Sequence, residues 1–204
     1  MKRCVIFGAA PVQDVECLRE YLLPDAYSIA ADGGIELART LGVKPDLIVA
    51  DCDSAPRPLD TGNSVLLPKQ KDDTDTFVAM HTAFQKGFCD FLLLGCLGGR
   101  MDHTVANLLN ARRLVEMGAQ VTLVDAKNEI SVLTAGTYAL RKGGFSVFSM
   151  TENVKGLCLS GVEYPLQDFT LQADNPLCVS NVAVSDAASM RFTSGVLLLI
   201  YAKD

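Results

Sequence analysis

The sequence predicts an α/β domain with a mostly parallel sheet, followed by an all-β domain. In residues 1–127, short apolar runs alternate with segments whose apolar residues recur at helical spacing. Three of these segments stop at a glycine that a strand follows within a few residues, as in repeated strand–helix–strand units. From residue 128 onward, strand-like runs follow one another between Gly, Asn, Asp and Pro turns, without a convincing helix.

The first domain is expected to contain six strands and four helices. A helix follows Pro11, a residue suited to a first helical turn, and carries Val12, Val15, Leu18 and Leu22 on one face. The other helices end at Gly42, Gly87 and Gly118. The strands are the apolar runs at residues 3–7, 27–31, 47–50, 65–67, 91–94 and 121–124.

The second domain is expected to span residues 128–204. No Pro/Ser-rich linker marks the boundary, so we expect the two domains to pack closely. Its expected strands are residues 129–133, 137–140, 145–149, 154–159, 169–172, 177–179, 190–193 and 196–201.

Composition excludes several classes of partner. The 204 residues carry a formal net charge of −6 and no cluster of basic residues interleaved with aromatics, which argues against nucleic acid. The longest apolar run, residues 196–202, falls well short of the roughly 20 residues of a membrane helix. The first eight residues contain too short an apolar stretch for a signal peptide, so we expect a cytoplasmic protein. Seven scattered cysteines and two histidines show no zinc-ligand spacing, so any metal should be oxygen-liganded.

Acidic residues and glycines follow several of the expected parallel strands. In such sheets, ligands gather beyond the carboxyl ends of the strands. Asp51 and Asp53 follow the third strand, and Asp72 and Asp75 immediately precede a helix. Each aspartate alone is more often a turn or cap residue, but their convergence on one rim favours a magnesium site. Asp32-Gly33-Gly34 after the second strand adds to the same rim.

A glycine-rich loop, residues 95–99, precedes Arg100 and suits phosphate binding, because glycines allow close backbone approach and a guanidinium binds phosphate oxygens. It matches neither the dinucleotide fingerprint nor the Gly-Lys-Ser/Thr phosphate loop. Asp102 could orient Arg100, contact a ligand or metal, or cap a helix that begins near Thr104. Asn107, one turn further on, could face inward or lie on the surface.

Together these segments resemble the thiamine pyrophosphokinase family across nearly the whole chain. The matching segments are residues 31–34, 45–48, 51–54, 72–75, 95–103 with Asn107, 161–166 and 180–181. The resemblance implies an α/β domain for nucleotide and metal, a β-sandwich domain for thiamine, and a homodimer with active sites between subunits. Its reaction would move a pyrophosphoryl group from ATP to thiamine, with Mg²⁺ as cofactor.

The resemblance also implies roles for individual residues. Those for magnesium are Asp51, Asp53 and Asp75, and those for catalysis are Asp72, Asp75, Arg100 and Asp102. Those for the nucleotide are Asp32, Gly33, Thr74, Arg100, Asp102 and Asn107, and those for thiamine are Tyr164, Ser180 and Asn181. The sequence does not single out a general base.

The chain departs from the family pattern at three positions. Ala50 and Cys52 stand where the family commonly has Gly and an aromatic residue, and Tyr164 stands where Trp is frequent. Two alternatives stay open. One is a pyrophosphokinase for another alcohol, such as a pterin, and the other is a binding module for thiamine diphosphate or a nucleotide without turnover.

Overall fold

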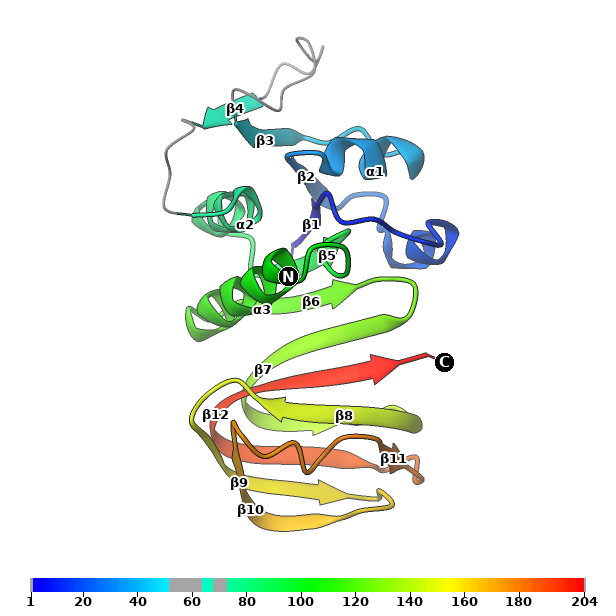
Figure 1. Ribbon diagram of the computed structural model, residues 1–204, viewed down its shortest axis with the longest axis vertical. Coiled ribbons are helices and arrows are strands. Elements are labelled where there is room, and N and C mark those ends of the chain that lie inside the picture. Colours follow the sequence, from blue (N-terminus) through cyan, green and yellow to red (C-terminus); the bar gives the residue numbers. More distant parts are fainter. Residues whose placement is uncertain (1, 52–63, 68–72, 204) are drawn as a thin grey trace. The chain divides into compact units, whose positions relative to one another are not determined.

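The computed structural model describes residues 2–51, 64–67 and 73–203, the side chains of residue 51 and residues 64–67 excepted (Figure 1). It divides into two compact units, Met1–Ala126 and Lys127–Asp204. Each unit has its own core of buried apolar side chains.

The first unit is built on a parallel sheet, as the strand–helix alternation predicts. Its described strands run in the order β6-β5-β1-β2-β3-β4, and every adjacent pair is parallel. The chain therefore starts in the middle of the sheet, moves outward through β4, and returns to the other side of β1. The strands are β1 Arg3–Phe7, β2 Tyr27–Ala31, β3 Leu47–Asp51, β4 Ser64–Leu67, β5 Asp90–Leu94 and β6 Gln120–Val124.

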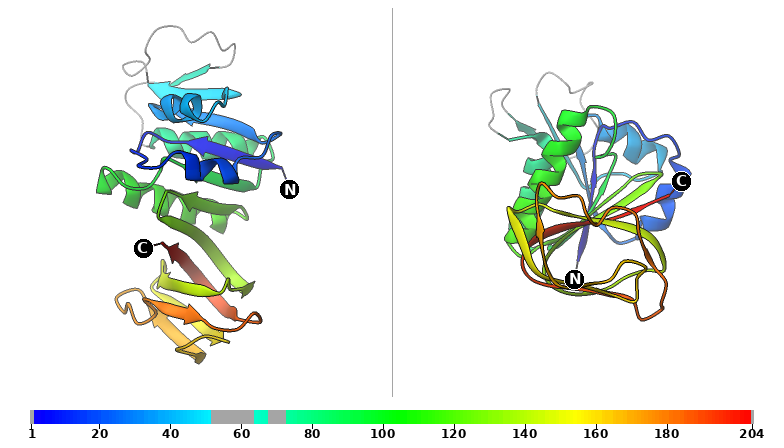
Figure 2. Two further views of the ribbon diagram at one scale, coloured as in Figure 1. Left: turned by 90° about the vertical axis from the view of Figure 1, so that its right-hand side faces the viewer. Right: turned by 60° about the horizontal axis from the view of Figure 1, so that its bottom comes forward.

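Helices cover both faces of this sheet, which is why its strands read as continuous apolar runs. On β1, the alternate residues Val5 and Phe7 pack with Leu18 and Leu41. Leu18 lies on a 3₁₀ helix, η1, and Leu41 follows α1. Figure 2 shows α2 and α3 on the opposite face. The helices are η1 Glu16–Tyr21, α1 Gly34–Thr40, α2 Asp75–Gln85 and α3 Met101–Glu116.

The helix predicted after Pro11 is wrong in type and start. The chain forms one short 3₁₀ helix at Glu16–Tyr21. The N-cap residue, Val15, makes no side-chain cap bond, although Asp14 Oδ1 accepts from Glu16 N at 3.1 Å. Only Leu18 within the helix is fully buried, so little packing supports a longer α-helix. The helix predicted to begin near Thr104 starts three residues earlier, at Met101.

The described part of the second unit has strands and no helix, and all of its described strand pairs are antiparallel. The last strand, β12, pairs with β9 through its first half and with β8 through its second half. A register shift between Phe192 and Val196 separates the halves and contains Gly195, at φ 98°. The strands are β7 Asn128–Ala139, β8 Gly143–Ser149, β9 Asn153–Ser160, β10 Leu166–Gln172, β11 Asn181–Ala183 and β12 Ser189–Ala202.

Two expectations about this unit need correction. The runs at 129–133 and 137–140 form one strand, β7, and those at 190–193 and 196–201 form β12. The run at 177–179 is a turn, and the short strand β11 begins two residues later, at Asn181. Ser180 has φ 58°, a left-handed conformation that belongs to a turn and not to a strand.

Candidate active site

The parallel sheet has its topological switch point between β1 and β5, where ligands of open α/β sheets bind. The loops that leave the carboxyl ends of these strands lie in direct backbone contact. Gly8 N donates to Leu94 O at 2.8 Å, and Ala10 N donates to Gly95 O at 2.8 Å. A Cβ on Gly8 would lie 2.5 Å from Gly95 O, so only glycine allows this approach. The Gly8–Ala10 loop was not among the expected site segments, although a glycine directly after the first strand is a signal for it.

The segment after β2 lies against the same switch point. Asp32 N donates to Val49 O at 2.8 Å, and Asp32 adopts φ 50°, which aspartate tolerates better than most residues. Two residues later, a Cβ on Gly34 would lie 1.9 Å from Phe7 O. The start of α1 therefore packs directly against the end of β1. Asp32 and Gly33 lie at the same rim of the sheet as the Gly8–Ala10 loop.

The glycine-rich loop after β5 is held from one side by α3. Gly95, Gly98 and Gly99 all have positive φ, between 63° and 77°. Asn107 is 7% exposed, and its Nδ2 donates to Cys96 O at 2.8 Å. Of the two positions expected for Asn107, the inward one is the one observed, and its amide holds the loop. Burial raises the pKa of the Cys96 thiol to about 12, so it stays protonated at neutral pH.

Arg100 and Asp102 form a bidentate pair at the start of α3. Arg100 Nε donates to Asp102 Oδ1 at 3.1 Å, and its Nη2 donates to Oδ2 at 2.6 Å. Asp102 Oδ1 also accepts from His103 N at 3.0 Å, so Asp102 both orients Arg100 and bonds the helix terminus. The side chains are 72% and 63% exposed. Hydrogen bonding and charge within the pair lower the pKa of Asp102 and raise that of Arg100.

The start of α2 places two further predicted residues. Thr74 is the N-cap, and its Oγ1 accepts from Phe77 N at 3.2 Å, so Asp75 is the first helical residue. Asp51 ends β3, where its backbone pairs with Leu67.

The described residues contain only part of the predicted acidic cluster for magnesium. Asp53 and Asp72 lie outside the described residues, and Asp51 is described by its backbone alone. Within the described part of the chain, no three His, Cys, Asp or Glu residues gather to hold a metal ion.

In the second unit, the predicted thiamine residues lie together around β11. Asn181 is 3% exposed, and its Oδ1 accepts from the backbone N–H groups of Tyr164 (3.1 Å) and Val182 (2.8 Å). Its Nδ2 donates to Tyr164 O at 2.8 Å, which leaves one amide proton for any other partner. Asn181 thus fixes the backbone of Tyr164, whose side chain is 63% exposed. Ser180 lies next to this pair, and its N–H donates to Ser146 Oγ at 3.0 Å.

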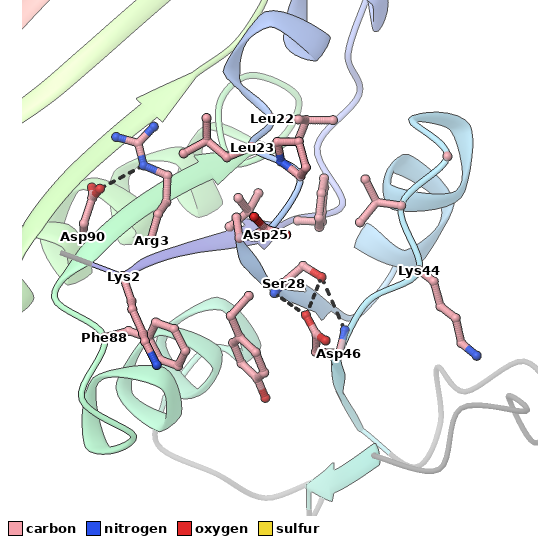
Figure 3. Close-up of a pocket in the computed structure, with 17 residues that line it drawn as sticks. Lys2, Arg3, Leu22, Leu23, Asp25, Ser28, Lys44, Asp46, Phe88 and Asp90 are labelled. Atoms are coloured by element: carbon pink, nitrogen blue, oxygen red, sulfur yellow. Dashed lines mark hydrogen bonds and ion pairs between the residues drawn. The ribbon is translucent and has the colours of Figure 1, made fainter.

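A groove of about 1,280 Å³ lies at the opposite, amino end of the parallel strands (Figure 3). Three of its charged groups, Arg3, Asp46 and Asp90, already bond to other groups of the protein. Arg3 Nε donates to Asp90 Oδ2 at 2.9 Å, and Asp46 Oδ2 accepts from Ser28 N at 2.8 Å and Ser28 Oγ at 3.1 Å. These hydrogen bonds satisfy polar groups at the amino ends of the strands. None of the predicted catalytic, magnesium, nucleotide or thiamine residues lines the groove.

No helix in the described residues combines the length and apolar character needed to cross a lipid bilayer. The fold and the rim thus define an α/β protein with a ligand site at its switch point and an antiparallel β unit after it.

Comparison with known proteins identifies the family. Residues 18–123 match the family model described as thiamin pyrophosphokinase, catalytic domain, and residues 139–197 match thiamin pyrophosphokinase, vitamin B1 binding domain. The chain belongs to the thiamin pyrophosphokinase family, as the resemblance in its sequence indicated.

Individual relatives agree with this assignment. Thiamine pyrophosphokinase of Bacillus subtilis is 26% identical over 214 residues, with all of both chains covered. A crystal structure of thiamin pyrophosphokinase from Geobacillus thermodenitrificans has a TM-score of 0.85 and 26% identity, covering 100% of this chain and 98% of the other. A thiamine pyrophosphokinase structure from Bacillus subtilis has a TM-score of 0.88 and 24% identity over the full length of both chains, a similarity in fold.

Proposed function

We propose that this chain is an enzyme that transfers a pyrophosphoryl group from ATP to the hydroxyethyl arm of thiamine. The observation that carries the proposal is the match of both parts of the chain to the two domains of one family, catalytic and vitamin B1 binding. The open rim at the β1/β5 switch point supports a nucleotide site in the first unit.

The nucleotide phosphates would bind over the loops after β1 and β5. Glycines in both loops let the backbone approach closely, and Arg100 is exposed within the same segment. In the described structure, Arg100 is paired with Asp102, so phosphate oxygens would compete for a guanidinium that is already oriented. The other predicted nucleotide contacts are Asp32, Gly33, Thr74 and Asn107.

Magnesium would be held by Asp51, Asp53 and Asp75, with Asp32 and Asp72 nearby. The donor chemistry fits, because the set consists of carboxylates, and Asp75 begins a helix at the carboxyl rim while Asp51 ends a strand there. When bound, the ion would neutralise charge on the phosphate oxygens.

The reaction forms a bond between the thiamine hydroxyl oxygen and the β-phosphorus of ATP. The bond from that phosphorus to the α–β bridging oxygen breaks, AMP leaves with this oxygen, and the hydroxyl loses its proton. Such transfers depend mainly on positioning and electrostatics. The contribution of Arg100 would be to stabilise charge on the transferred group, and the carboxylates Asp72 and Asp102 are candidates to accept the proton.

Thiamine would bind to the second unit, for which the resemblance implies a β-sandwich. Tyr164 presents an exposed ring suited to a cationic thiazolium or a flat pyrimidine, and Asn181 holds its backbone in place. Ser180 would add a polar contact. We further propose a cytoplasmic homodimer in which this unit serves the active site of the partner subunit.

AMP release from ATP by the purified protein tests the proposal directly. With Mg²⁺ present, we expect AMP and thiamine diphosphate to appear in equal amounts when thiamine is added. AMP release with a pterin alcohol but not with thiamine would show that the acceptor is a pterin. Binding of thiamine diphosphate or a nucleotide without AMP release would favour a binding module without turnover.

A matched pair of variants tests the site within the same assay. Asp75→Asn removes one carboxylate from the proposed magnesium set, and we expect kcat to fall by about 100-fold or more. Asp174→Asn makes the same chemical change in an exposed turn of the second unit and should leave kcat within about twofold. An unchanged Asp75→Asn enzyme would remove Asp75 from the proposed site.

A further inference from the structure

Helix α3 carries two buried amides on one face, three residues apart. Asn107 and Asn110 are 7% and 8% exposed. Buried amides are stabilised only where hydrogen bonds satisfy them, so their partners identify what they hold. Asn107 holds the glycine-rich loop through Cys96 O. Asn110 reaches in another direction, toward α2, which lies beside α3 on the same face of the sheet (Figures 1 and 2).

Asn110 bonds the residue that caps α2. Its Nδ2 donates to Thr74 Oγ1 at 3.2 Å, while the same oxygen accepts from Phe77 N at 3.2 Å. Thr74 Oγ1 caps the first turn of α2, and the bond from Asn110 restrains this same oxygen, so loss of Asn110 should loosen the cap as well as the contact with α3. The additional bond therefore fixes where the start of α2 lies relative to α3.

Arg113, one turn further along α3, contacts residues before and after Asp75 in the first turn of α2. Its Nη1 donates to Asp73 Oδ1 at 3.0 Å, and its guanidinium carbon lies 3.8 Å from the centre of the Phe77 ring. Together, Asn110 and Arg113 contact residues 73, 74 and 77, which bracket Asp75 on both sides. We call these contacts the α3 clamp.

We propose that Asn110 and Arg113 are positioning residues that set the carboxylate of Asp75 relative to Arg100 for binding of a magnesium–triphosphate group. This inference rests on the proposed function of Asp75. Helix α3 begins directly after Arg100, and the clamp fixes the first turn of α2 to the same helix. A displacement of about 1 Å at such a site can lower the rate by about 100-fold. A rigid link between Asp75 and Arg100 would therefore affect the rate of the proposed reaction.

Two variants remove the clamp with different risks to folding. Asn110→Ala deletes the buried amide, and Arg113→Met keeps the length of an exposed side chain while removing its charge and donors. Each should lower kcat by about 10-fold or more and raise the Mg²⁺ concentration needed for half-maximal activity several-fold. The thiamine KM should stay within about twofold, because none of the clamp residues belongs to the predicted thiamine set of Tyr164, Ser180 and Asn181.

Controls separate positioning from general stability. Arg39→Met also removes an exposed helical arginine with an acidic partner, Glu36, but on α1, and should leave activity and Mg²⁺ dependence unchanged. Arg113→Lys retains the charge opposite Asp73 and should recover part of the loss. Equal effects on the thiamine KM and on Mg²⁺ dependence would contradict the proposal.

Hydrogen exchange tests the clamp without any activity. In Asn110→Ala, the Phe77 amide should exchange at least about tenfold faster than in the unmodified protein, while amides in the middle of β5 keep their rates. Unchanged exchange at Phe77 would overturn the clamp itself. Faster exchange in a protein that releases no AMP with thiamine would retain the clamp and reject the proposed function.

Discussion

At the residue scale, the pair of Arg100 and Asp102 holds in one orientation the guanidinium that we propose binds phosphate. The two side chains are exposed, so their attraction is screened by water and contributes little to the stability of the fold. Its effect is geometric: both hydrogen bonds hold the guanidinium plane in one orientation. In the proposed function, phosphate oxygens would replace the carboxylate partner without the arginine first having to be ordered.

The pKa of Asp102 depends on its hydrogen bonds with Arg100. Hydrogen bonding from Arg100 is the main reason that this pKa is lowered, and the His103 N–H adds to it. Because the folded-state pKa is depressed, the stabilisation by the pair is present at neutral pH and is lost as pH falls through that pKa. We expect Arg100→Met to raise the pKa of Asp102, as measured by carbon NMR of its carboxyl group. Arg39→Met should not change it, and an unshifted Asp102 in Arg100→Met would show that the pair does not persist in solution.

At the element scale, the regular parts of the fold were predictable and the strained parts were not. Buried parallel strands such as β1 and β5 read as uniform apolar runs, and the glycines after α1 and α2 marked the helix ends. Leu177–Val179 has the same apolar character as a strand, yet it forms a turn, because backbone geometry at Ser180 decides the outcome. Composition carries no signal for such a conformation.

The site was likewise only partly predictable. The aspartates and Arg100 stood out because carboxylates and guanidinium groups are conspicuous after strands. Asn110 and Arg113 did not, since a polar residue on a helix usually lies in solvent, and only the packing of α3 on α2 buries the amide.

The contact between α1 and β1 gives a prediction for one element. Gly34→Ala would place its Cβ 1.9 Å from Phe7 O, a backbone atom that cannot move aside cheaply. We expect a loss of about 3 kcal/mol or more in the free energy of unfolding, measured by urea titration.

A second glycine provides the control for that experiment. Gly144→Ala, at a position in β8 with open space around the new Cβ, should change the free energy of unfolding by less than about 0.5 kcal/mol. Similar losses of unfolding free energy in the two variants would mean that the close contact between residue 34 and Phe7 O does not cause the destabilisation.

At the scale of the whole molecule, the parallel sheet has two ends with different properties. The carboxyl end gathers loops with positive-φ glycines, exposed Arg100 and the predicted carboxylates. The amino end has a groove of about 1,280 Å³, but Arg3 and Asp46 there already bond to other groups of the protein. Sheet topology is therefore the basis on which we propose that the nucleotide binds at the carboxyl end.

This difference predicts a pattern of ligand protection across the first unit. A non-hydrolysable ATP analogue with Mg²⁺ should slow hydrogen exchange at residues 8–10, 32–36 and 95–103, because a ligand bound over these loops would reduce their local opening. Residues 27–28 and 43–46, which line the amino-end groove, should exchange at the same rate with and without the analogue. Protection of the groove alone would place the nucleotide at the amino end and exclude the switch-point site. Protection at the carboxyl end that Arg100→Met weakens would assign the guanidinium to phosphate binding, because that variant removes the charge and leaves the glycine loops in place.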